Sequence, residues 1–226
     1  MFASLLAALR SGDTLDKAFS EFDEMLSAGE WMFREVRSIL EGHTDPKAAR
    51  EALFIKDQEI NALLRSLRSN IVTHLTVNSN ADIPACLVLM SIAKDAERIG
   101  DYCKNLFEVT EHGGTRGSTD AYSDRVSALP GEVEPIFELV RIAFGESSPK
   151  QAKVAIKAAD AVRRACDSLS DDLLRDRTAI SAHNAVSYSL QTRHCKRIAS
   201  HLANISTAVF GRIEDLDFRK SPKPSE

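Results

Sequence analysis

The sequence predicts an all-α protein made of two tandem three-helix bundles. Apolar residues recur at helical spacing along six long segments, and no segment alternates polar and apolar residues for long enough to propose a sheet. The chain also carries two similar landmarks, because GHTDPK at 42–47 is echoed by GESSPK at 145–150. We therefore expect one helical unit that is used twice.

The first half is predicted to hold three long helices after a short apolar start. The start, MFASLLAALRSGD, reads as a short amphipathic helix that ends at Ser11-Gly12. Gly42 closes the first long helix, and Pro46 lies in the first turn of the second, where its missing N–H costs nothing. The three long helices are expected to run from 13 to 41, from 45 to a turn at 78–81, and from about 84 to 111.

The second half repeats this plan after a glycine-rich linker at 113–118. Pro130 and Pro135 are expected to bend or split its first helix. Its three helices are predicted at about 120–144, 149–177 and 181–212. We place the first bundle at 1–113, the second bundle at 119–213 and a polar tail at 214–226, whose proline-containing end is expected to be disordered.

Composition narrows the function classes. The formal net charge is −4, and positive and negative residues are mixed along the chain. The chain therefore lacks the block of basic residues that would indicate a nucleic-acid partner. The apolar start lacks a basic region and is too short to span a bilayer, and no later segment approaches a membrane span. We expect no direct membrane insertion and a cytoplasmic protein. Four scattered cysteines without a C-x-x-C pair are expected to be reduced, packed thiols: Cys86, Cys103, Cys166 and Cys195.

The stretch DAERIGDYCKN, from Asp95 to Asn105, is the most informative motif, and KRIASHLAN at 196–204 is its shorter echo. Glu97 and Asp101 are four residues apart, so they share the outer face of their helix, opposite an apolar stripe. On the preceding long helix, Asp57 and Asn61 have the same spacing. Oxygen ligands from two adjacent helices can hold a hard or borderline cation. The alternative is a solvated acidic face that Lys94 and Arg98 neutralise.

The sequence ERIGD followed by Asn105, on the third helix of a duplicated three-helix unit, resembles the PhoU family of phosphate-uptake regulators. The resemblance covers about residues 10 to 212. It implies two tandem three-helix bundles whose E(D)-x-x-x-D motifs hold multinuclear metal clusters on the bundle surface. It therefore implies a divalent or ferric metal ion at the first bundle, where Asn61 stands in the place of the family's usual aspartate. The implied ligands are Asp57, Asn61, Glu97 and Asp101.

The second half departs from this pattern. Lys196 and Ser200 replace the two carboxylates of the sixth helix, and Arg164 follows Asp160 on the fifth. Positive side chains oppose the binding of a cation, so we expect no family-type cluster in this half.

The resemblance implies a cytosolic negative regulator of phosphate uptake and phosphate-starvation signalling. Its implied partners are a membrane phosphate transporter and its sensor histidine kinase, and a homodimer is expected. We do not expect an enzyme, because the chain has no P-loop, no G-x-S-x-G and no Rossmann fingerprint. The alternatives are a PhoU-like accessory protein of another transporter, a metal-dependent helical-bundle enzyme, or a metal buffer.

Two further groups have competing interpretations. His194 and His201 are seven residues apart and share a helical face, so with Cys195 they are either a transition-metal site or two groove histidines. Trp31, followed by a methionine and a phenylalanine, is either part of the core or dimer contact, or lines a groove for a partner.

Overall fold

The fold is known from a computed structural model, which describes residues 13–78, 81–112, 117–175 and 180–211, with 213 and 216. The short helix predicted over residues 1–12 and the polar tail, apart from Leu216, lie outside these residues. The described chain forms six helices and no strand, as predicted. The helices are α2 (Asp13–Leu40), α3 (Pro46–Val77), α4 (Ile83–Glu111), α5 (Ser123–Gly145), α6 (Pro149–Arg175) and α7 (Ala182–Ala208).

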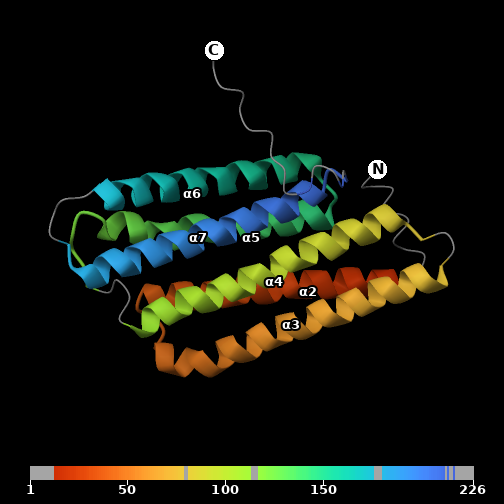
Figure 1. Ribbon diagram of the computed structural model, residues 1–226, viewed down its shortest axis with the longest axis horizontal. Coiled ribbons are helices and arrows are strands. Elements are labelled where there is room, and N and C mark those ends of the chain that lie inside the picture. The colour runs from red at the N-terminus through yellow and green to blue at the C-terminus, as the bar shows by residue number, and fades with distance from the viewer. Residues whose placement is uncertain are drawn as a thin grey trace, which may run out of the picture.

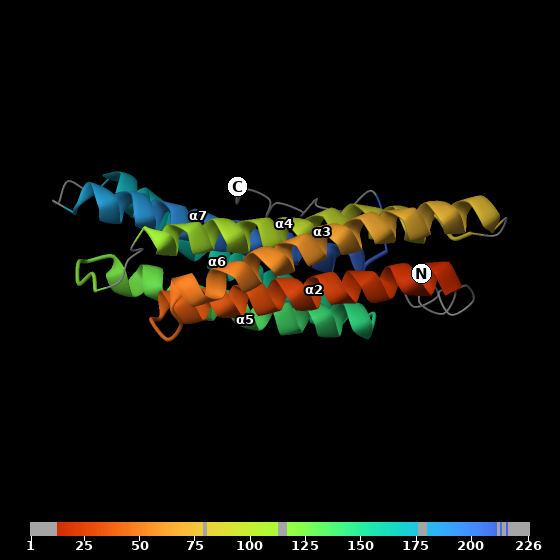
Figure 2. The same ribbon diagram turned by 90° about the horizontal axis from the view of Figure 1, so that it is seen from below.

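The six helices are arranged as two three-helix bundles that lie side by side. Helices α2, α3 and α4 pack on one another, as do α5, α6 and α7 (Figure 1). The bundles meet where α4 packs against α7 and α2 packs against α5, and all six helices follow the long axis of the molecule (Figures 1 and 2). The motif helices of the two copies, α4 and α7, are therefore neighbours.

Local capping explains where several helices begin and end. Asp45 accepts a hydrogen bond from the backbone N–H of Lys47 at the start of α3, and Asp82 does the same for Ala85 in α4. A proline occupies the first turn of both helices, as expected. Gly42, after α2, has a φ of 85°, a conformation that favours glycine and ends the helix.

The prolines of α5 do not split it, which corrects the prediction. Residues 123–145 form one continuous helix that contains Pro130 and Pro135. Proline has no backbone N–H, so Pro130 leaves the carbonyl of Val126 without its usual helical donor. The side chain of Gln191 on α7 is buried and donates a hydrogen bond of 3.3 Å to this carbonyl. A neighbouring helix therefore supplies the donor that the proline removes.

The apolar residues form one core that continues from one bundle to the other. Phe22 of α2 lies 4.8 Å from Phe144 of α5 between ring centroids, and Phe33 lies 5.5 Å from Phe137. These contacts bury aromatic area between the bundles. The four cysteines are free and buried, in agreement with the predicted packed thiols. None of the described helices combines the length and the apolar character needed to cross a bilayer.

Candidate functional site

The glycine of the ERIGD motif brings α3 and α4 close together. A β-carbon on Gly100 would lie 2.9 Å from Cδ1 of Ile60 and 3.9 Å from Oδ1 of Asp57. A side chain at this position would force the Ile60 side chain to shift. The close approach places Asp57 of α3 beside the acidic face of α4.

Three carboxylates gather along this contact. Asp57 is buried, Glu97 keeps 12% of its side chain exposed and Asp101 keeps 32%. The prediction that both carboxylates lie on the outer face of their helix is therefore only partly correct, because the Glu97 side chain is largely enclosed. Burial and, next, the charge of Glu97 raise the pKa of Asp101, and the charge of Asp57 adds to this. The carboxylates thus share one electrostatic site.

Each carboxylate has a basic partner. Lys104 Nζ lies 2.9 Å from Asp57 Oδ2 and 3.8 Å from Asp101 Oδ1, so its ammonium group links α3 to α4. Lys94 Nζ is 2.6 Å from Glu97 Oε1. Arg98 Nη1 is 3.8 Å from Asp101 Oδ2. The contacts of Lys94 and Arg98 agree with the alternative interpretation, in which these two residues neutralise the acidic pair.

Lys104 is the residue that the sequence analysis missed. It follows Asp101 by three residues and so lies on the same side of α4, a signal that could have identified it. Burial lowers the pKa of Lys104, but its hydrogen bond to Asp57 and the charges of Asp57 and Asp101 outweigh burial and raise it. The Lys104 side chain is therefore held as a cation.

Asn61 is placed on α3 as predicted, but its amide group is engaged locally. Its Nδ2 donates a hydrogen bond of 3.0 Å to the backbone carbonyl of Asp57. Its Oδ1 is the atom that could serve a cation as ligand, one turn from the Asp57 carboxylate.

The side chains at this site are of the types that bind metal ions, but their positions in the structure do not form a metal site. In the described parts of the chain, no three His, Cys, Asp or Glu side chains are close enough together to hold one. Glu97 Oε2, however, is buried without a hydrogen-bond partner, and Arg98 Nε lies 4.0 Å away. Carboxylates with one unengaged oxygen suit a hard cation.

Asp95, at the start of the motif, serves a different contact. It accepts hydrogen bonds from His201 Nδ1 at 2.7 Å and from Asn204 Nδ2 at 3.0 Å, both on α7. The ring of Tyr102 packs against His201, with centroids 5.6 Å apart, and against His194, at 5.9 Å. The two histidines therefore lie in the contact between α4 and α7 and help to join the bundles.

The corresponding positions of the second bundle carry mixed charges. Arg163 Nη1 lies 2.8 Å from Asp160 Oδ1, and Lys196 pairs with Asp167. Ser200 donates a hydrogen bond of 2.8 Å to the backbone carbonyl of Lys196. Lys196 and Arg164 occupy the places that Glu97 and Asn61 hold in the first bundle.

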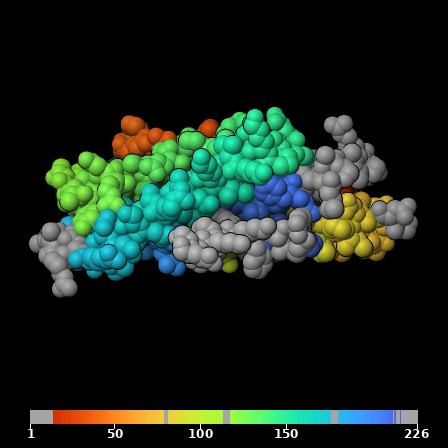
Figure 3. All heavy atoms as spheres, turned by 90° about the horizontal axis from the view of Figure 1, so that it is seen from above, coloured from red at the N-terminus to blue at the C-terminus, as the bar shows by residue number. Residues whose placement is uncertain are grey.

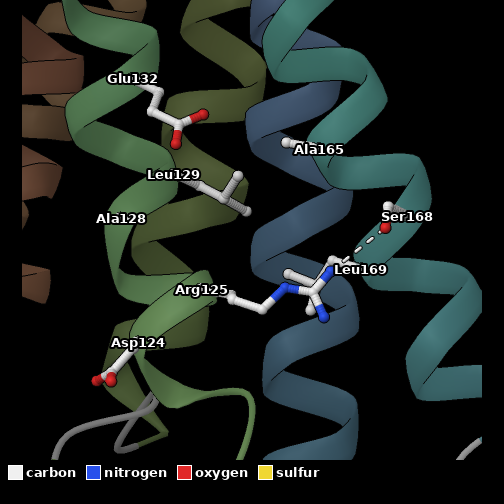
Figure 4. Close-up of a pocket in the computed structure, with 8 residues that line it drawn as sticks. All are labelled: Asp124, Arg125, Ala128, Leu129, Glu132, Ala165, Ser168 and Leu169. Atoms are coloured by element: carbon white, nitrogen blue, oxygen red, sulfur yellow. Dashed lines mark hydrogen bonds between the residues drawn. The ribbon is translucent and has the colours of Figure 1, made fainter.

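A hollow of about 370 Å³ lies between α5 and α6, away from the carboxylates of the first bundle. Arg125 reaches from α5 toward α6, where its guanidinium donates a hydrogen bond of 3.4 Å to Ser168 (Figure 4). The guanidinium also lies 2.7 Å from the carboxylate of Asp172 on α6. The small side chains of Ala128 and Ala165 leave the space that forms the hollow. An exposed ion pair between Arg125 and Asp172 thus links α5 to α6 beside the hollow.

Comparison with known sequences points to one family. A family model described as the PhoU domain matches residues 22–110, which include all four predicted ligands. The phosphate-specific transport system accessory protein PhoU homolog of Synechocystis sp. is 25% identical over 156 residues, or 68% of this chain and 69% of the relative. The homolog of that name from Zymomonas mobilis is 34% identical over 89 residues, or 38% of this chain and 37% of the relative.

Solved structures show the same fold. The crystal structure of PhoU from Pseudomonas aeruginosa matches with a TM-score of 0.76 and 20% identity, covering 87% of this chain and 95% of that one. The phosphate transport system regulatory protein PhoU from Streptococcus pneumoniae matches with a TM-score of 0.70 and 17% identity, covering 91% and 97%. The whole six-helix arrangement, and not only the first bundle, is therefore a known architecture.

Proposed function

The chain belongs to the PhoU family, through the PhoU domain that residues 22–110 match, and we propose that it is an accessory protein of a phosphate transport system. In this role it damps phosphate uptake and phosphate-starvation signalling when phosphate is plentiful. The observation that carries the proposal is the match of the ERIGD-bearing bundle to the family. The fold match along nearly the whole chain supports it.

We propose that the chain works by protein contact and not by turnover. Its relatives are named as accessory or regulatory proteins. Its own surface offers long helical faces, such as the one that α5 and α6 form (Figure 3). Exposed charged side chains alternate with small residues along α6, which suits contact with another protein surface: Lys153, Lys157, Arg164 and Asp167. The proposed partners are a membrane phosphate transporter and its sensor histidine kinase.

The partner proposal is tested by affinity purification of the tagged full chain from membranes of cells grown at high and low phosphate. Subunits of a phosphate transporter and a histidine kinase should co-purify with the chain and not with the tag alone. Recovery of another transporter instead would support the alternative of a PhoU-like accessory protein of that transporter. Recovery of no membrane protein in either medium would contradict the proposal. The homodimer and the cytoplasmic location stay predictions.

We also propose that Asp57, Asn61, Glu97 and Asp101 receive a divalent or ferric ion. When bound, the ion supplies positive charge that joins α3 to α4. Elemental analysis of protein purified without chelator should find metal in the wild type. The metal should be lost in a Glu97→Ala, Asp101→Ala double variant and kept in Asp160→Ala, which removes the second-bundle carboxylate that corresponds to Asp57. Full metal content in the double variant would rule out this site.

A further inference from the structure

The carboxylates between α3 and α4 already have a cation of their own. Lys104 reaches from α4 across to Asp57 and also lies near Asp101, with 23% of its side chain exposed. Lys94 and Arg98 are more exposed, at 42% and 49%. Lys104 is therefore the enclosed cation of the site, and the other two lie at its rim.

We propose that Lys104 is an internal counter-ion that competes with a metal ion for Asp57 and Asp101, and so sets how readily the site takes up metal. This inference rests on the proposed metal site. Two cations cannot occupy the space between the same carboxylates without strong repulsion. The lysine stem is flexible, so its ammonium can move out to water while the backbone of α4 stays in place.

The charges around the site explain the direction of the effect. Three carboxylates, those of Asp57, Glu97 and Asp101, face three basic groups on the described helices. Each of these carboxylates therefore already has a positive partner without metal, which weakens its attraction for a further cation. Loss of the Lys104 charge leaves one unbalanced negative charge at its enclosed centre, next to the unengaged Oε2 of Glu97. This change should strengthen metal binding.

The proposal also describes how α3 and α4 are held together. Without metal, Lys104 links the helices through its contact with Asp57. With metal, the link passes to an ion held by residues of both helices. The two helices can then be joined in two alternative ways, by Lys104 or by a metal ion. The metal concentration determines which of the two is present.

The test is titration of the full chain with Mn²⁺, a cation that favours oxygen ligands, by calorimetry and by the electron paramagnetic resonance signal of the free ion. Lys104→Met should lower the Kd for Mn²⁺ by at least about tenfold, which corresponds to about 1.4 kcal/mol. Lys56→Met is the matched control, because it removes the same charge from the residue next to Asp57 while its ammonium pairs with Glu59. The control should change the Kd by less than about threefold, since its charge lies outside the site.

Lys104→Met leaves the buried Asp57 without its hydrogen-bond partner. The second variant is therefore Lys104→Gln, because the glutamine side chain is neutral and still offers a hydrogen-bond donor. It should show the same gain in affinity. An unchanged Kd in a folded Lys104 variant would overturn the competition while leaving the metal site in place. Tight binding that survives Asp57→Asn in the Lys104→Gln background would also overturn it, because the ion would then lie elsewhere. If neither the wild type nor the variants bind Mn²⁺, the metal site itself is wrong and the competition falls with it.

Discussion

Gly100 packs so closely on Ile60 that a β-carbon at position 100 would lie 2.9 Å from Ile60 Cδ1. Ile60 is almost fully buried, so its side chain has little room to move. The glycine of the motif is thus a packing residue, and it brings the carboxylates of α3 and α4 together.

Gly100→Ala should therefore destabilise the protein. Alanine gains about 1 kcal/mol over glycine as a helix former, but overpacking in a core costs about 1–3 kcal/mol, so we expect a net loss of up to about 2 kcal/mol. Urea denaturation measures it. Gly145→Ala is the control, because a β-carbon there meets nothing within 4 Å. Equal stabilities for Gly100→Ala and Gly145→Ala would show that α3 and α4 can separate without cost.

Asp101→Asn should leave the metal-free protein nearly as stable as the wild type. Burial and the charge of Glu97 both disfavour the Asp101 carboxylate, so the loss of its charge offsets the loss of its contacts with Lys104 and Arg98. We expect a change well under about 1 kcal/mol, or a few degrees in Tm, by thermal denaturation with chelator present. A large fall in Tm would mean that Asp101 supports the fold directly.

His194 should make the protein sensitive to mild acid. Burial, and next the charge of Arg193, lower the pKa of His194 from 6.5 to about 4 in the folded chain. Between these two values the unfolded chain binds the proton and the folded chain does not, so the free energy of unfolding falls as the pH falls from 6.5 to 4. The full loss from this residue is about 3 kcal/mol.

His194→Gln removes the titrating group and should flatten this part of the stability curve. Urea denaturation of both proteins at pH 7, 5.5 and 4 gives the difference in slope. Asp120 acts at lower pH, because its hydrogen bonds outweigh burial and lower its pKa below 3.8. The same slope in wild type and variant would mean that His194 gains its proton without unfolding.

Gln191 should matter only because Pro130 is present. Gln191→Leu leaves the buried carbonyl of Val126 without this donor, which costs about 1–3 kcal/mol. Pro130→Ala restores a backbone N–H that can bond to the same carbonyl, so Gln191→Leu should cost less in that background. A double-mutant cycle measured by denaturation gives the coupling. Additive effects of the two changes would contradict this role for Gln191.

Local signals in the sequence predicted much of the fold. Asp45-Pro46 and Gly42 mark helix ends because capping and φ preferences act within a few residues. The continuity of α5 through Pro130 could not be predicted, since its extra donor comes from Gln191 on another helix. Helix α7, predicted to extend to 212, ends at Ala208, shortly before Gly211, whose φ is 67°.

The residues of the candidate site were predictable to a similar extent. Helical spacing paired Glu97 with Asp101 on one helix and Asp57 with Asn61 on the preceding one. Spacing says nothing about the distance between helices, so neither the enclosure of Glu97 nor the reach of Lys104 to Asp57 was visible. The bond of Asp95 to His201 joins residues of two bundles, and only the packed structure brings them together.

Deletion of the gene is the most direct test of the proposed role as a negative regulator. The deletion strain, grown in phosphate-rich medium, should take up phosphate faster than the parent and express its phosphate-starvation genes, and a plasmid copy of the full chain should reverse both effects. Normal uptake and silent starvation genes in the deletion strain would contradict this role.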